Sequence, residues 1–157
     1  MANPISAELT TGTVGELLVQ LRLLQYGVQA APPLKDSGND LIALRGWEVR
    51  CIQVKTTSDR CPAWPDETKL YHLLAVVKLE GEGHELHLDA TAIYLLSKPE
   101  LMELRQSWEA LGRFKMTAER IDVLFASGND ARSSGAREDE LAALPRQILG
   151  SDICKNS

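Results

Sequence analysis

The chain has few cysteines and few aromatic residues, and it contains no long hydrophobic run. Its three cysteines, Cys51, Cys61 and Cys154, form no CxxC pair, so the sequence predicts neither a disulfide framework nor a zinc knuckle. No apolar stretch approaches the roughly 20 residues of a transmembrane helix. The N-terminus lacks the basic and apolar regions of a secretory signal. These absences favour a protein of the reducing cytoplasm that does not bind membranes.

An excess of positive charge is also missing, because 17 basic and 22 acidic side chains give a net charge of −5. Residues 1–60 carry six basic and six acidic side chains, so the whole acidic excess falls after residue 60. A general basic coat for nucleic acid is therefore excluded. Any nucleic-acid contact must be local, or must rely on a metal ion and the groove of a dimer.

The length of 157 residues predicts a single domain, 1–157, with its own hydrophobic core. A helix is expected over 13–26, capped by Thr13 and ended by Gly27. Its apolar residues recur at helical spacing and are expected to form one stripe that faces the core. That stripe consists of Val14, Leu17, Leu18, Leu21 and Leu24.

Strands are expected at 28–32, 40–44, 48–56, 71–80 and 91–97, and the second and third of these read as a hairpin around Arg45-Gly46-Trp47. Further helices are expected from Pro99 to about 110 and over 117–125, with Thr117 as a cap. A flexible linker at about 127–139 and a helical tail at 140–150 follow. This order of elements predicts an α/β or α+β fold in which helices flank a mixed sheet.

The tetrapeptide SGND occurs twice, and only its first copy precedes a predicted hairpin. Asp40 ends that copy and opens one strand, and the hairpin brings it beside the Gln53–Lys55 stretch of the partner strand. Side chains alternate along a strand, so Gln53 and Lys55 are expected on one face. Glu16 lies about 160° from Val14 around the predicted helix, and its face could look toward Asp40.

These elements resemble the PD-(D/E)XK nuclease superfamily. The matching residues are the glutamate in GELLVQLRLLQYG, the aspartate in SGNDLIAL and the QxK in CIQVKTTS, which together cover about residues 12–60. Their order and separation are most similar to the Holliday-junction-resolvase-like and group I intron homing-endonuclease branches. The resemblance implies a restriction-endonuclease-like α/β core, with a mixed β-sheet flanked by helices.

The resemblance also implies a magnesium-dependent DNA endonuclease, with manganese able to replace magnesium. The implied catalytic residues are Glu16, Asp40, Gln53 and Lys55. Asp40, the Gln53 amide oxygen, Glu16 and the backbone carbonyl of Val54 would supply oxygen ligands of the kind that Mg²⁺ prefers. Lys55 would orient or deprotonate the attacking water, or neutralise charge on the phosphate.

The partner implied is duplex or branched DNA, cut by a homodimer or homotetramer because such substrates have two-fold symmetry. Four polar residues near the predicted site could donate hydrogen bonds to phosphate oxygens. These predicted nucleic-acid contacts are Ser37, Gln20, Thr56 and Thr57.

Gln53 stands where the commonest pattern has a glutamate, which leaves two negative groups at the site rather than three. A rival interpretation is therefore a non-catalytic module that keeps the fold to bind DNA or protein. A third is an interaction domain from a toxin or defence system.

Each predicted site residue also has an ordinary structural explanation. Thr13 and Glu16 have the spacing of a capping box, and Asp40 alone is typical of a turn. An HxxH pair near residue 85 hints at a metal site, but its members would face opposite sides of a strand, so a solvated acidic hairpin is favoured. That group consists of Glu82, His84, Glu85, His87 and Asp89.

Overall fold

The computed structural model describes residues 7–35, 38–58, 62–66, 68–81, 87, 89–104 and 107–126. Residues 1–126 form one compact unit. The predicted linker at about 127–139 and the predicted tail at 140–150 lie outside the described residues, as does most of the predicted acidic hairpin. Among the described residues, no helix is both long enough and apolar enough to cross a membrane.

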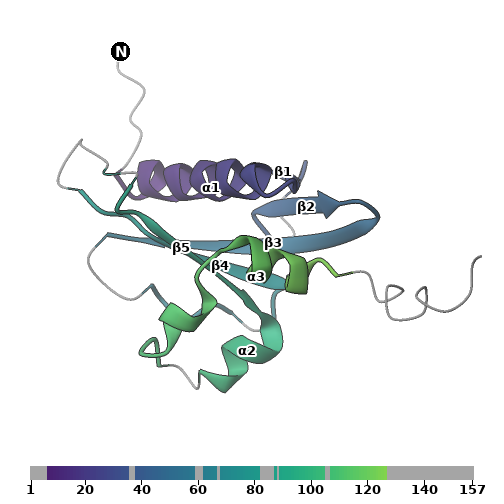
Figure 1. The fold of residues 1–157 in the computed structure, drawn as a ribbon. Coiled ribbons are helices and arrows are strands. Elements are labelled where there is room, and N and C mark those ends of the chain that lie inside the picture. Colours follow the sequence, from purple (N-terminus) through teal and green to yellow (C-terminus); the bar gives the residue numbers. More distant parts are fainter. Residues whose placement is uncertain are drawn as a thin grey trace, which may run out of the picture. The chain divides into compact units, whose positions relative to one another are not determined.

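The fold is α/β, with a mixed five-stranded sheet between helices (Figure 1). The strands lie in the order β1-β2-β3-β4-β5, and every neighbouring pair is antiparallel except β3 and β4, which are parallel. The predicted fold class and the predicted hairpin are confirmed. The elements are α1 (Ala7–Gln25), β1 (Gln29–Ala31), β2 (Leu41–Arg45), β3 (Glu48–Thr57), β4 (Leu73–Lys78), β5 (Ala92–Ser97), α2 (Lys98–Glu103), the 3-10 helix η1 (Leu111–Phe114) and α3 (Ala118–Leu124).

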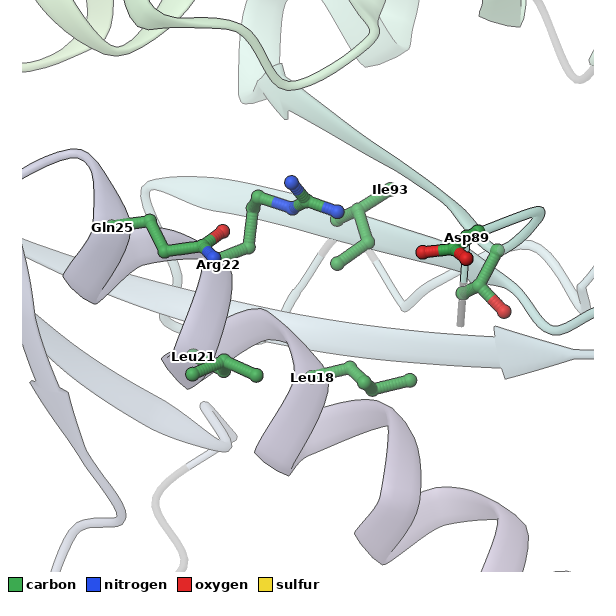
Figure 2. A pocket seen from close by; sticks show the side chains of 7 residues that line it. Leu18, Leu21, Arg22, Gln25, Asp89 and Ile93 are labelled. Carbon is green, nitrogen blue, oxygen red and sulfur yellow. The ribbon is translucent and has the colours of Figure 1, made fainter. Parts of the chain in front are cut away.

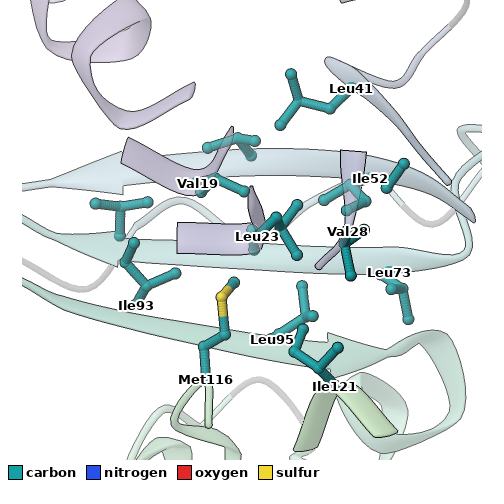
Figure 3. Packing of buried hydrophobic residues seen from close by; sticks show 14 of the residues in the cluster. Val19, Leu23, Val28, Leu41, Ile52, Leu73, Ile93, Leu95, Met116 and Ile121 are labelled. Carbon is teal, nitrogen blue, oxygen red and sulfur yellow. The ribbon is translucent and has the colours of Figure 1, made fainter. Parts of the chain in front are cut away.

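The sheet separates two hydrophobic cores. The larger core packs residues of α1 and α3 against one face of the sheet, and Figure 3 shows Leu23, Ile52 and Ile121 within it. The smaller core lies on the other face, under α2 and η1, and includes Leu74 and Leu96. Because β4 contributes to both cores, its five residues Leu73–Val77 are all buried and apolar, as expected for a strand covered on both faces.

The face of α1 that meets the sheet differs from the prediction. Val19 and Leu23 are fully buried, whereas Leu17, Leu21 and Leu24 are 58%, 53% and 62% exposed. The predicted stripe therefore points mainly away from the core.

The reason for this orientation lies at Gly15. A Cβ atom built on Gly15 would come within 1.9 Å of Oγ1 of Thr56, so only glycine lets the helix approach β3 this closely. Placing Gly15 against the sheet turns Val19 and Leu23 inward, because they follow at intervals of four residues. Val14 and Leu18 pack at the margin of the larger core.

The ends of α1 confirm one prediction and correct another. The helix begins at Ala7, so Thr13 lies within it and cannot cap it, and the capping-box interpretation of Thr13 and Glu16 is wrong. Gly27 adopts a φ of 74°, and its amide donates to the carbonyl of Leu24 at 3.0 Å. That left-handed conformation ends the helix as predicted.

The shorter helices also fit the predictions in part. α2 ends at Glu103 rather than near residue 110, and a separate 3-10 turn follows at 111–114. Thr117 caps α3 as expected, since its hydroxyl accepts a hydrogen bond from the amide of Arg120 at 3.2 Å. Arg120 in turn pairs with Glu100 of α2 and donates from Nε to the carbonyl of Leu95 at 3.0 Å. These contacts tie α2 and α3 to β5.

Replacing Gly15 with alanine is expected to lower the free energy of unfolding by about 1–3 kcal/mol, because the added methyl group would overpack the contact with Thr56. Gly12→Ala is the matched control in the same helix. No atom lies within 4 Å of a Cβ at Gly12, so alanine there should stabilise the protein by up to about 1 kcal/mol. Urea denaturation of both variants measures the difference, and equal stability would contradict the close approach of α1.

Candidate functional site

Asp40 lies at the start of β2 and is held by the neighbouring strand. Its amide donates to the carbonyl of Ile52 at 2.9 Å, which continues the β2–β3 ladder by one residue. Its Oδ2 atom accepts hydrogen bonds from the amide of Val54 at 2.6 Å and from Nε2 of Gln53 at 2.5 Å. The predicted position of Asp40 beside the Gln53–Lys55 stretch is therefore confirmed.

The Gln53 side chain is buried, and its two polar atoms differ in their surroundings. The residue is only 5% exposed, and Nε2 donates to Asp40. The Oε1 atom is buried and has no hydrogen-bond partner within the described part of the chain. Nε2 is therefore the amide atom that faces the Asp40 carboxylate, and Oε1 is bonded to the same amide carbon. A buried amide oxygen without a donor is costly unless a group such as a cation satisfies it.

The SGND turn presents Asp40 to β3. Gly38 has a φ of 93°, and a Cβ there would lie 3.2 Å from that of Lys69, so glycine suits both the turn and its packing. Asn39 is buried, and its amide nitrogen lies 3.4 Å from the carbonyl of Leu41. Burial of Asn39 was not predicted, because as an isolated residue in this tetrapeptide it only indicates a turn. Its contact with Leu41 supports the backbone on which Asp40 sits.

Glu16 reaches the same end of β3 from α1. It follows Gly15, which packs on Thr56, two residues beyond Val54. Burial and the negative charge of Asp40 raise the pKa of Glu16 above its ordinary value of 4.5. Burial is the larger of the two causes, and the convergence of the two carboxylates on one site stays a prediction.

Lys55 follows Gln53 by two residues along β3. Strand alternation places Gln53, Lys55 and Thr57 on the face opposite α1, while Ile52 and Val54 belong to the core beneath the helix. Lys55 is half-buried and is paired in register with Val76 of β4. The β2–β3 register ends at Ile52, and the following part of β3 stays paired with β4. Lys55 and the helix that carries Glu16 therefore lie on opposite faces of the sheet.

The predicted phosphate contacts are only partly brought together. Thr57 shares the face of Lys55, whereas Thr56 packs against Gly15 beneath α1. Gln20 lies one turn beyond Glu16, and its Nε2 donates to the carbonyl of that residue at 3.3 Å. Ser37 lies outside the described residues.

Of the alternative metal site near residue 85, the structure describes only His87 and Asp89. His84, Glu82 and Glu85 lie outside the described residues. In the described segments, no group of three or more His, Cys, Asp or Glu side chains is arranged to hold a metal ion. The cluster at Asp40 has two carboxylates, and its other oxygens come from an amide and the backbone.

The raised pKa of Glu16 predicts how stability depends on pH. A carboxyl whose pKa is higher in the folded state contributes stability that is fully present below its unfolded pKa of about 4.5. That contribution is lost as the pH rises through the higher folded pKa, because folding then confines a charged group near Asp40. Stability measured against pH should therefore fall more for the wild type than for Glu16→Gln.

Urea denaturation of both proteins from pH 4 to pH 7, with a chelator present, measures this difference. The advantage of Glu16→Gln over the wild type should grow across the interval and then level off. A difference that is constant with pH would show that Glu16 carries no such penalty.

No protein-family model matches the chain, and no curated protein matches it in sequence. The fold is similar to the solved structure of the bacterial homing endonuclease I-Ssp6803I, with a TM-score of 0.59 and 15% sequence identity. The similarity covers 80% of this chain and 98% of that chain. The five-stranded mixed sheet with its flanking helices is therefore a homing-endonuclease-like fold.

Proposed function

We propose that this protein is a magnesium-dependent DNA endonuclease of the PD-(D/E)XK superfamily, with one active site in a single nuclease-like domain. The observation that carries the proposal is the buried Oε1 atom of Gln53, to which no described residue donates a hydrogen bond, in the same amide whose Nε2 contacts the Asp40 carboxylate. The position of Glu16 near Asp40 and the homing-endonuclease-like fold support the same conclusion.

The proposed metal ligands suit magnesium by their chemistry. Asp40 and Glu16 offer carboxylate oxygens, Gln53 an amide oxygen and Val54 a backbone carbonyl, and Mg²⁺ prefers such oxygen donors. Manganese accepts the same donors and should replace it. When bound, the ion supplies a Lewis acid that activates water and offsets charge on the phosphate.

Val54, Glu16 and Lys55 would each have a separate role in the reaction. The amide of Val54 fixes the orientation of the Asp40 carboxylate through its 2.6 Å hydrogen bond. The carboxyl of Glu16, with its raised pKa, is suited to hold a water molecule and accept a proton from it. The ammonium of Lys55 would orient that water or stabilise negative charge as it develops on the phosphate.

The substrate proposed is duplex or branched DNA. Ser37, Gln20, Thr56 and Thr57 are the proposed phosphate contacts, of which Thr57 shares a strand face with Lys55. Cutting both strands of a two-fold substrate requires two copies of the site, so a homodimer or homotetramer is proposed as the active form.

A second candidate function is a non-catalytic module that binds DNA or protein, as in a toxin or defence system. The hydrogen bond from Nε2 of Gln53 to the Asp40 carboxylate favours this candidate, because it satisfies that carboxylate without a cation. The net charge of −5 also opposes extensive contact with DNA. The two candidates differ in whether a divalent ion binds at Asp40.

Replacing Lys55 with alanine should reduce nicking of supercoiled DNA by about 100-fold or more, because one electrostatic group at a reacting centre is worth about that much. The melting temperature should change little, since Lys55 is only half-buried. Lys115→Ala, at an exposed position directly after η1, is the matched control and should cleave like the wild type. Full activity of Lys55→Ala would remove Lys55 from the mechanism.

Magnesium or manganese should raise the melting temperature of the wild type, because a ligand that binds only the folded state stabilises it. At a tenfold excess over the dissociation constant the gain is about 1.4 kcal/mol. Asp40→Asn should show no such gain, since it loses the charged ligand. A wild type that shows neither a thermal shift nor nicking would favour the non-catalytic module.

A further inference from the structure

The outward side of α1 carries no charged residue. With 100° per residue measured from the buried Val19, Glu16 and Arg22 lie about 60° to either side, toward the sheet. The remaining arc, which we call the α1 outer face, is formed by uncharged residues alone. Its exposed members are Thr10, Thr13, Leu17, Leu21, Leu24 and Gln25, and it is bordered by the half-buried Val14, Leu18 and Gln20.

Such a face is unusual for a helix surface in contact with water. A quarter of this chain is charged, and a solvated helix face is normally rich in charge. Depletion of charge together with exposed leucines is instead the composition of the centre of a protein interface. Leu17, Leu21 and Leu24, each more than half exposed, form the middle of this face.

The spacing of the apolar residues indicates what kind of element would cover them. Val14, Leu17, Leu21 and Leu24 are separated by three, four and three residues, which is the a/d spacing of a helix–helix seam. The positions beside the seam are also uncharged, since they include Thr13, Gln20 and Gln25. The matching surface is therefore an apolar helix without charged flanks.

We propose that the α1 outer face pairs with the same face of a second copy of this chain across a two-fold axis. Identical uncharged faces can meet without repulsion between like charges, whereas a chain of net charge −5 opposes self-association through its other, charged surfaces. A charged partner would find no complementary group on this face. The proposal rests on the proposed function in one respect, that a two-stranded substrate needs two sites.

A hollow at one margin of the face gives the partner helix a place to seat a side chain. It has a volume of about 240 Å³ and lies between α1 and the start of β5, with Leu18, Leu21 and Ile93 among its apolar lining (Figure 2). Arg22 and Asp89 also line it, and their opposite charges leave the hollow neutral. At the other margin lie Gln20 and, next to it, Glu16 of the candidate site, so pairing would bring two sites toward one interface.

The test is the molar mass of the full-length chain, measured by light scattering and sedimentation from 1 to 100 µM without DNA. The wild type should reach at least twice the 17.3 kDa of one chain, and Leu21→Glu should halve its mass. Circular dichroism should remain unchanged, because Leu21 is 53% exposed, whereas the melting temperature should fall when the pair is lost, since a bound partner stabilises the folded chain. Met102→Glu, at a residue of α2 that is 55% exposed, is the matched control and should keep the wild-type mass.

Two results would overturn the pairing. One is a wild-type mass of a single chain at every concentration, and the other is an assembly that Leu21→Glu leaves intact. Nicking assays separate this inference from the proposed function. A stable pair that never cleaves DNA would contradict only the endonuclease, while metal-dependent cutting of both strands by a protein that stays monomeric would contradict only the pairing.

Discussion

The hydrogen bond from the amide of Val54 to the carboxylate of Asp40 is the contact on which the rest of the site depends. It spans the point where the β2–β3 ladder ends, so one contact both closes the ladder and fixes a carboxylate at the sheet edge. The same Oδ2 atom accepts a hydrogen bond from Nε2 of Gln53, and Oε1 of that amide is buried. The orientation of Gln53 is thus a consequence of how Asp40 is held.

A second constraint, the missing side chain at Gly15, brings α1 to this edge. The helix rests directly on Thr56, and the next residue along it is Glu16. This approach confines two carboxylates in one region and raises the pKa of Glu16, which is unfavourable for folding alone. Local costs of this kind are common where a protein has a site to maintain, because bound ligands can offset them.

Much of this arrangement could be predicted from the sequence, because it follows from short-range patterns. The Arg45-Gly46-Trp47 turn between two apolar runs specifies the hairpin, and alternation along β3 separates Gln53 and Lys55 from the core residues. These two features were sufficient to place Asp40 beside Gln53.

The orientation of α1 was predicted wrongly, because periodicity identifies an apolar stripe but not the surface that the stripe contacts. Leu17, Leu21 and Leu24 form the most regular stripe, yet the sheet takes the side with Gly15. A glycine inside a predicted helix was the available indication of a close approach. The burial of Asn39 and Gln53 depends on tertiary packing, which no local pattern specifies.

Crystals grown with manganese chloride test the central claim most directly, because manganese can be located by its anomalous scattering. The account predicts an ion bound by the Asp40 carboxylate and by Oε1 of Gln53, with Glu16 close enough to contact it directly or through water. Saturating manganese that leaves this edge of the sheet without an ion, or an ion bound elsewhere while Gln53 keeps its oxygen turned away, would contradict the account.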